Sequence, residues 1–347
     1  MKGRFRVLVA DDSPTARELL VAIVSGDSRF HVVGAARNGN EAVAMAKSLS
    51  PDIALLDIHM PGMDGVEATR HIMAEAPTPV IVVSASVDVR DLAVAFEAER
   101  AGAVAARPKP MGPHSPSFAR DSAELLSTLH LMVGMKVVRR HRPPSPRSAP
   151  IEAQAASVVA LVCSTGGPPA LAAIVASLPA DFPLPLLCVQ HMSKGWMAGL
   201  VKWLDEISKI RVKLAEDAEP LRPGTLYFAP EDRHLALAGR HFLRLLDGPP
   251  VAGFRPSGTT LFESVAHAFG REALGIILTG MGEDGVAGLR VLRESGGACI
   301  AQDRESSVVW GMPGAAVAAG LANDVRSLDG MVRLLNEVGR ARRSGGG

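Results

Sequence analysis

Three polar residues at the ends of apolar runs could form a hydrolytic centre. Ser164 follows the run VVALVC, His191 ends the run LLCVQH, and Asp284 follows GIILTG within a glycine-rich stretch. A serine hydroxyl is a weak nucleophile unless a neighbouring base removes its proton, and a carboxylate can hold an imidazole base in the useful tautomer. These residue types favour acyl transfer through a serine nucleophile. A serine in such a place can also be a helix cap without any chemistry.

The stretches around Ser164 and Asp284 could also supply donors for an oxyanion. Two glycines after Thr165 let the backbone turn tightly, and the backbone amides of Thr165 and Met281 are the candidates to bind a developing negative oxygen. The glycines on both sides of Asp284 would fold a loop around it. We therefore expect Asp284 to be the inward carboxylate and its neighbour Glu283 to face solvent.

A second set of polar residues marks the ends of strand-like runs in the first third of the chain. Its members are Asp11, Asp12, Asp57, Ser84 and Lys109. Crowded carboxylates repel one another, and a hard divalent cation such as Mg²⁺ relieves that repulsion. The lysine and the serine hydroxyl could bind phosphate oxygens, and an aspartate beside them could accept a phosphoryl group as a nucleophile. This set predicts a magnesium-assisted phosphoacceptor site.

Short apolar runs alternate with helical patterns in both halves of the chain, which is typical of parallel βαβ units. In the first half, the predicted strands cover residues 6–10, 31–36, 53–58, 79–85 and 101–106. In the second half, they cover residues 157–163, 185–191, 225–230, 234–239, 275–280 and 298–302. We therefore expect two doubly wound parallel-sheet α/β domains. Ligands bind at the carboxyl ends of strands in such sheets, where both sets of polar residues would lie.

The composition narrows the class of protein. A length of 347 residues suggests two domains, and a net charge of +1 gives no indication of nucleic-acid or membrane-surface binding. The three cysteines have no metal-ligand spacing, and the first residues do not form a signal peptide. These features favour a cytoplasmic protein with reduced thiols that does not insert into a membrane.

Residues 131–155 include the proline- and arginine-rich stretch RRHRPPSPR and are predicted to be a linker. This places the first domain at residues 1–130 and the second at residues 156–342. A surface loop of one larger domain is the alternative interpretation of the same stretch. Its arginines could touch nucleic acid, but a solvated linker is the expectation.

The first domain resembles a response-regulator receiver domain. The likeness is carried by VADDSPTAR, LLDIHMPGMDG, PVIVVSA and RPKP. It implies a flavodoxin-like fold and phosphorylation of Asp57 by a partner histidine kinase. It also implies Mg²⁺ bound by Asp12 and Asp57, with help from Asp11 and the His59 carbonyl. Receivers usually carry an aromatic residue shortly before the lysine, and Ala106 stands at that position, so the usual aromatic relay is not expected.

The second domain resembles the catalytic domain of the chemotaxis protein-glutamate methylesterases, with a Rossmann-like α/β fold. The likeness is carried by CSTGGPPAL, QHMSKGW, LRPGTLYFAPEDRHL, RPSGTTLFESVA, LTGMGEDGVAGL and AQDRESSVVWGMPGAAV. It implies hydrolysis of glutamate methyl esters, and deamidation of certain glutamines, on the cytoplasmic helices of methylated chemoreceptors. It implies no cofactor for the ester chemistry, which would rest on Ser164, His191 and Asp284.

Four positions depart from the pattern of that family. Val162 stands where glycine is frequent, Ser193 where proline is frequent, and Gly258 and Thr259 where valine and aspartate are usual. We expect Val162 to narrow the turn around Ser164 and the other three to tune contacts with the substrate.

The order of the two domains predicts a regulated enzyme. The unphosphorylated receiver would block the esterase opening, and phosphate on Asp57 would relieve the block. A transcriptional regulator is one alternative, but the second half is long and shows no basic recognition helix. Another alternative is an esterase-fold adaptor or phosphate sink in a chemosensory pathway unrelated to motility, which measurement of methanol release would separate from the enzyme.

Overall fold

The computed structural model describes residues 4–85, 89–133 and 156–344. The chain divides into two compact units, Met1–Arg142 and Pro143–Gly347. The linker predicted over residues 131–155 lies outside the described residues except for residues 131–133, which end the last helix of the first unit and cap it. No helix of the described residues is both long enough and apolar enough to cross a bilayer.

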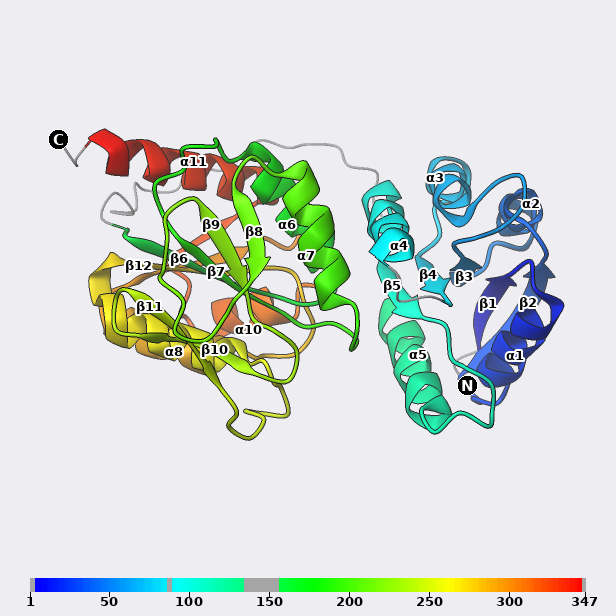
Figure 1. Cartoon of the computed structure of the whole chain (residues 1–347). Helices are drawn as coiled ribbons and strands as arrows, with labels where there is room; N and C mark the ends of the chain where they lie inside the picture. The colour runs from blue at the N-terminus through cyan, green and yellow to red at the C-terminus, as the bar shows by residue number, and fades with distance from the viewer. Residues whose placement is uncertain (1–3, 86–88, 134–155, 345–347) are drawn as a thin grey trace. The chain divides into compact units, whose positions relative to one another are not determined.

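The first unit is a five-stranded parallel sheet with helices between the strands (Figure 1). Its strands are β1 (Phe5–Ala10), β2 (Phe30–Ala36), β3 (Ile53–Asp57), β4 (Val80–Ser84) and β5 (Ala105–Pro108). Its helices are α1 (Pro14–Ser25), α2 (Gly39–Leu49), α3 (Gly65–Glu75), α4 (Val89–Ala101) and α5 (Phe118–Met132). All residues of β3 and β4 are buried, as expected for strands covered on both faces.

The strand order in this unit is β2-β1-β3-β4-β5. The chain therefore changes direction across the sheet between β1 and β3, and such a switch point opens a crevice beyond the carboxyl ends of the two strands. Asp11 and Asp12 follow β1, and Asp57 ends β3. The acidic residues thus stand at the place where this topology puts a ligand.

The fifth strand lies further along the chain than predicted. Residues 101–106 were expected to form it, but Ala101 ends α4 and Gly102 turns the chain with a φ of +118°. The strand begins at Ala105 and reaches Pro108. The predicted run consists of small residues, and Val104 is its one β-branched residue, the type that favours strands. The sequence therefore did not show where the strand begins.

The second unit contains a seven-stranded parallel sheet and a separate antiparallel hairpin. The sheet strands are β6 (Val158–Cys163), β7 (Leu186–Gln190), β8 (Arg211–Leu214), β9 (Thr225–Phe228), β12 (Ala273–Ile277), β13 (Ala298–Gln302) and β14 (Asp324–Arg326). The hairpin strands are β10 (His234–Ala238) and β11 (Phe242–Leu246). The helices are α6 (Gly167–Ser177), α7 (Met197–Ile207), α8 (Gly258–Phe269), α9 (Val286–Glu294), α10 (Met312–Ala318) and α11 (Leu328–Ser344), with a short 3₁₀ turn, η2 (Gly270–Glu272).

The strand order of this sheet is β14-β13-β12-β6-β7-β9-β8, so the later strands lie on both sides of β6. Helix α6 packs against α7 and α11, whereas α8 packs against α9 and the hairpin, and Figure 1 shows the two groups on opposite faces of the sheet. All six residues of β6 are buried. The switch point beside β6 places a crevice at its carboxyl end, directly where Ser164 follows.

Four strands of this unit differ from the prediction, and one of them is β11, the second strand of the hairpin, which was not predicted. The strand predicted at residues 234–239 belongs to the hairpin and not to the main sheet. The edge strands β8 and β14 were not predicted at all. Both are short, carry charged residues and are only partly buried, so they lack the apolar run by which the inner strands were recognised.

Candidate active site

Ser164 and His191 leave neighbouring parallel strands at the same level. Cys163 at the end of β6 is the register partner of Gln190 at the end of β7. The amide of His191 donates a hydrogen bond of 3.0 Å to the carbonyl of Cys163. Ser164 and His191 are therefore the next residues on two strands whose axes lie about 4.8 Å apart. Both residues are half-buried.

The side chain of Gln190 fixes the backbone at both positions. Its Nε2 donates hydrogen bonds of 2.8 Å to the carbonyls of Ser164 and His191. Gly167, the first residue of α6, leaves room for this amide, because a Cβ at that position would overlap the glutamine side chain. The relative position of serine and histidine thus depends on a buried polar residue that the sequence did not single out.

Asp284 lies in the loop after β12 and faces the imidazole of His191. Its Oδ2 is 2.9 Å from His191 Nε2. This distance is that of an ion pair. Within the described residues, neither ring nitrogen makes a hydrogen bond of good geometry. Hydrogen bonds between catalytic groups often become shorter and better aligned when substrate binds. Because Nε2 faces the carboxylate, Nδ1 is the ring nitrogen that remains available to a second group. Glu283 is exposed, as expected.

The start of α8 holds the Asp284 carboxylate in place. Oδ1 accepts a hydrogen bond of 2.7 Å from the hydroxyl of Ser257, and Oδ2 accepts one of 2.6 Å from the amide of Gly258. Burial raises the pKa of Asp284, but the nearby imidazole and these hydrogen bonds outweigh burial and lower it. The carboxylate is therefore ionised at neutral pH.

The loop after β12 passes close to Ser164. The Ser164 amide donates a hydrogen bond of 3.0 Å to the Thr279 carbonyl, and a Cβ on Gly280 would lie 2.8 Å from Ser164 Cβ. Met281 is the next residue after Gly280 in this loop, and Thr165 follows the serine directly. The amide of neither residue donates a backbone hydrogen bond within the described residues. The two predicted oxyanion donors therefore lie near the serine with their hydrogens uncommitted to the backbone.

Thr279 links the turn after β6 to the loop before α10. Its hydroxyl donates a hydrogen bond of 2.9 Å to the carbonyl of Thr165 and accepts one of 2.9 Å from the amide of Val309. Its amide donates to Oε1 of Gln302 over 2.7 Å. Thr279 itself is buried, and these bonds tie the turn that carries the serine to two neighbouring loops.

The second predicted set gathers at the carboxyl ends of the strands in the first unit. Carboxylate oxygens of Asp11, Asp12 and Asp57 lie within 4.8 Å of one another. Lys109 Nζ lies 2.8 Å from Asp11 Oδ2 and 3.0 Å from Asp57 Oδ1. Ser84 is buried at the end of β4, and its carbonyl accepts a hydrogen bond of 2.7 Å from the Lys109 amide. The fold thus brings all five residues to one edge of the sheet.

This set contains carboxylates that can bind a cation and an ammonium group that can bind an anion. Burial raises the pKa of Asp57, and Lys109 offsets that effect only in part. Burial lowers the pKa of Lys109, but its contacts with the two aspartates outweigh burial and raise it. Asp11 Oδ2 is buried and accepts no hydrogen bond among the described residues. Crowded, hard carboxylate oxygens of this kind fit a magnesium ion.

Comparison with known proteins shows which family this chain resembles. The sequence model of the CheB methylesterase family matches residues 159–335, and that of the response regulator receiver domain matches residues 7–115. A "protein-glutamate methylesterase/protein-glutamine glutaminase 4" of Myxococcus xanthus (strain DK1622) is 50% identical over 98% of both chains. The chain belongs to the CheB methylesterase family.

Two further members of the CheB methylesterase family match closely. A "protein-glutamate methylesterase/protein-glutamine glutaminase 3" of Anaeromyxobacter dehalogenans (strain 2CP-C) is 47% identical and covers 93% of this chain and 96% of its own length. The solved catalytic domain of the Thermotoga maritima CheB methylesterase is 36% identical, with a TM-score of 0.52 over 53% of this chain and 98% of that chain. The second unit therefore has the fold of a CheB catalytic domain.

One departure from the CheB family pattern has a role different from the one predicted. Thr259 was expected to tune substrate contacts, but it is buried, so this expectation is wrong. Its hydroxyl accepts a hydrogen bond of 3.1 Å from the Gly285 amide, and its own amide lies 3.2 Å from Asp284 Oδ1 as a donor. Thr259 therefore supports the loop that carries Asp284.

Several residues that support this CheB site were missed. Gln190, Ser257 and Thr279 act through side-chain hydrogen bonds that reach residues distant in the chain. Phe254 stacks on the His191 ring with centroids 4.4 Å apart and an interplanar angle of 19°. Gln190, Ser257 and Thr279 lie inside motifs that carry the family likeness, and Phe254 directly precedes one, but no spacing or periodicity indicated what each of them contacts.

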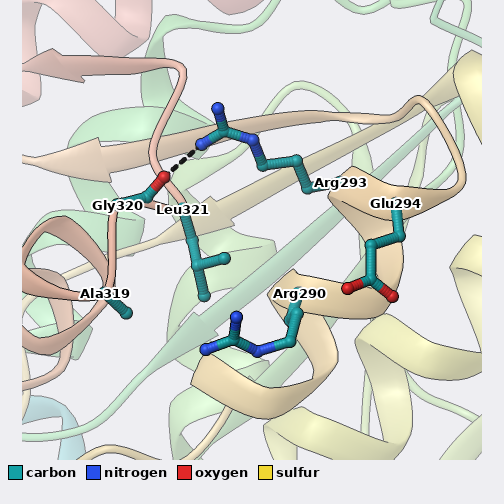
Figure 2. Close-up of a pocket in the computed structure, with 6 residues that line it drawn as sticks. All are labelled: Arg290, Arg293, Glu294, Ala319, Gly320 and Leu321. Atoms are coloured by element: carbon teal, nitrogen blue, oxygen red, sulfur yellow. Dashed lines mark hydrogen bonds between the residues drawn. The ribbon is translucent and has the colours of Figure 1, made fainter.

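A hollow of about 400 Å³ lies away from this site (Figure 2). It is lined by Arg290, Arg293, Glu294, Ala319, Gly320 and Leu321. Arg293 donates a hydrogen bond to the Gly320 carbonyl, and all three charged residues are exposed. The end of α9 precedes β13, so this hollow belongs to the amino-terminal edge of the sheet, opposite the edge that carries Ser164.

Proposed function

We propose that the chain is a phosphorylation-regulated hydrolase that removes methyl groups from glutamate methyl esters, and deamidates certain glutamines, on the cytoplasmic helices of chemoreceptors. The observation that carries the proposal is the Asp284 carboxylate 2.9 Å from the imidazole of His191, which follows β7 at the same level at which Ser164 follows β6. The printed names of the M. xanthus and A. dehalogenans relatives support the same substrate class. A protein that acted only as an adaptor would not need a carboxylate paired with an imidazole beside a serine.

The first stage would form an acyl-enzyme. Ser164 Oγ attacks the ester carbonyl carbon while His191 Nδ1 takes the hydroxyl proton, and Asp284 stabilises the resulting imidazolium through Nε2. The amides of Thr165 and Met281 donate to the oxygen that becomes negative. The carbon–oxygen bond to the leaving group then breaks, and His191 gives its proton to the departing methoxide, which leaves as methanol.

The second stage would regenerate the enzyme. His191 takes a proton from water, whose oxygen attacks the acyl carbon, and the bond to Ser164 Oγ breaks as the serine recovers its proton. The product is a glutamate carboxylate. With a glutamine substrate the leaving group in the first stage is ammonia, and the same second stage also yields glutamate. No cofactor enters this scheme.

The first unit would control this reaction by accepting a phosphoryl group from a histidine kinase. An Asp57 oxygen attacks the phosphorus of a phosphohistidine, the phosphorus–nitrogen bond breaks, and the phosphoryl group is transferred to Asp57. Lys109 and Ser84 would bind phosphoryl oxygens. Asp11, Asp12 and Asp57 would hold Mg²⁺, which when bound screens the negative charge of the incoming group. Phosphorylation would shift the chain from a blocked to an open state.

Methanol release from a methylated receptor fragment tests the hydrolase. We expect the full chain to release methanol and Ser164→Ala to lose on the order of 10⁴-fold or more in rate. Ser177→Ala is the matched control, because its hydroxyl only donates to the Ile174 carbonyl within α6. Methanol release by Ser164→Ala at the rate of the unchanged chain would refute the assignment of the nucleophile.

Regulation is tested by comparing the full chain with a fragment that starts at Ala156. We expect the fragment to be faster than the unphosphorylated full chain, and a small acyl phosphate with Mg²⁺ to speed the full chain but not its Asp57→Asn variant. Equal rates for the fragment and the unphosphorylated full chain would contradict inhibition by the first unit.

A further inference from the structure

One loop contacts both His191 and Asp284. It runs from Pro249 to Ser257, between the hairpin and α8, and is called here the Pro249–Ser257 loop. Near its middle, Phe254 stacks on the imidazole of His191. At its end, the Ser257 hydroxyl donates a hydrogen bond to Asp284. The base and its carboxylate partner are therefore both held by a segment that supplies no reacting atom.

The middle of this loop is a tight turn. The amides and carbonyls of Val251 and Phe254 exchange two hydrogen bonds, of 3.0 and 2.9 Å. Between them, Ala252 and Gly253 have φ values of +49° and +86°. Two successive positive φ values define a turn whose backbone twist suits a two-residue hairpin. The turn thus holds the backbone of Phe254 in one conformation, from which its ring reaches His191.

The buried imidazole of His234 closes the loop at its two ends. Its Nδ1 accepts a hydrogen bond of 3.1 Å from the Ser257 amide, and its Nε2 lies 3.0 Å from the Pro249 carbonyl. An amide can only donate and a carbonyl can only accept, so Nδ1 is unprotonated and Nε2 carries the hydrogen. This single neutral tautomer satisfies both ends, and His234 is 2% exposed.

We propose that the Pro249–Ser257 loop is a positioning device for the His191–Asp284 pair, with Phe254 and His234 as its positioning residues. The proposal rests on the proposed hydrolase function. The stacked ring restricts rotation of the imidazole, so that Nε2 stays toward Asp284 and Nδ1 toward Ser164. It also offers its face to the imidazolium that forms as the serine attacks, and an aromatic face attracts a cation.

The stack is tested by Phe254→Leu in the full chain, with a methylated receptor fragment as substrate. We expect kcat to fall about tenfold or more, since small misplacement of a catalytic group is costly, while KM changes less than about twofold. Phe254→Tyr keeps the ring and should restore kcat. The matched control is Phe242→Leu, which changes an aromatic residue that is 47% exposed on β11. An unchanged kcat, or a change in KM alone, would overturn the proposal.

A spectroscopic readout separates positioning from general damage. A ring stacked at 4.4 Å shifts the resonances of the His191 ring protons to higher field. Phe254→Leu should remove that shift, and His191→Gln identifies the resonance. If Phe254→Leu left the resonance in place, the stack would not exist in solution. Should the unchanged chain release no methanol, the proposed function would fail, while this resonance would still decide whether Phe254 holds the imidazole.

The role of His234 is tested by a double-mutant cycle. His234→Asn can still accept from the Ser257 amide but is too short to reach the Pro249 carbonyl, and we expect it to lower kcat in the same direction as Phe254→Leu. If both residues act through one loop, the double variant should lose clearly less than the product of the two single losses. Fully multiplicative losses would overturn the shared mechanism. His241→Asn, on the exposed turn of the hairpin, is the control.

Discussion

The side chain of Val162 occupies the space that a side chain on residue 258 would need. A Cβ built on Gly258 would lie 2.9 Å from Val162 Cγ2 and 3.2 Å from Val162 Cβ. The family likeness implies glycine at the first position and valine at the second, the reverse of what this chain has. The volumes at the two positions are coupled, since the bulk of Val162 leaves no room for a side chain on residue 258 and so compensates for its absence there.

This compensation predicts the outcome of exchanging the two residues. Gly258→Val alone should overpack the site beside Asp284 and cost about 1–3 kcal/mol in the free energy of unfolding, with loss of activity. Val162→Gly alone should cost a similar amount by leaving a cavity. The double variant should recover most of both losses. Urea unfolding and methanol release measure this, and additive destabilisation in the double variant would contradict the compensation.

Asp284→Asn should abolish most of the esterase activity. The amide cannot hold the His191 tautomer that leaves Nδ1 free to accept a proton, and a comparable change in a related constellation costs about 10⁴-fold in kcat. Glu283→Gln, on the exposed neighbour, should have little effect. The measurement is kcat for methanol release by both variants. Similar losses in the two variants would mean that Asp284 has been assigned the wrong role.

Gln190→Met should impair the site without touching a reacting atom. It removes the donors to the carbonyls of Ser164 and His191 while keeping the length of the side chain. Leaving buried carbonyls without donors should cost about 1–3 kcal/mol in stability. We expect kcat to fall as well, because no side-chain amide then connects the carbonyls of Ser164 and His191. Thermal unfolding together with kcat tests this, and a stable variant with unchanged kcat would refute it.

Thiol reagents should leave the activity intact. Cys163 precedes the serine, but it is fully buried, as are Cys188 and Cys299. Burial raises the pKa of Cys188, and it raises the pKa of Cys299 to about 12, so neither is a thiolate at neutral pH. Iodoacetamide should modify no cysteine before unfolding, as mass spectrometry would show. Inactivation in parallel with alkylation of Cys163 would point to a thiol nucleophile instead of Ser164.

The stability of the first unit should fall as pH rises toward neutrality. Burial raises the pKa of Glu99 from 4.5 to about 7. The folded unit therefore holds the Glu99 proton more tightly than the unfolded chain does. The resulting stabilisation is fully present below pH 4.5, and about 3 kcal/mol of it is lost as pH rises through 7.

Glu99→Gln should remove this dependence. Glutamine can still accept the hydrogen bond that the Ala106 amide donates to Glu99 over 2.9 Å, but it does not titrate. Urea unfolding of a residue 1–133 fragment at pH 5 and pH 7.5, followed by circular dichroism, provides the comparison. If the difference between the two pH values were the same in both fragments, Glu99 would not be its source.

The sequence allowed the places of these candidate site residues in the fold to be predicted, because each stands at the end of an inner strand. Ser164, His191 and Asp57 end apolar runs, and parallel topology brings such ends to one edge. Phe254 and His234 could not be found in this way. Phe254 lies in a turn, and His234 begins a hairpin outside the main sheet. Their contacts with the site residues therefore depend on tertiary packing. Likewise, β8 and β14 were missed because edge strands need no apolar run.

The central place of β6 has a consequence for how access to the serine could change. Hydrogen bonds to β12 and β7 flank this strand on both sides, and its amide hydrogens should be among the slowest in the second unit to exchange with solvent. Loosening β6 would require opening the most protected part of the domain. We therefore expect any motion that changes access to Ser164 to come from segments beyond the strand ends, while Ser164 itself stays in place.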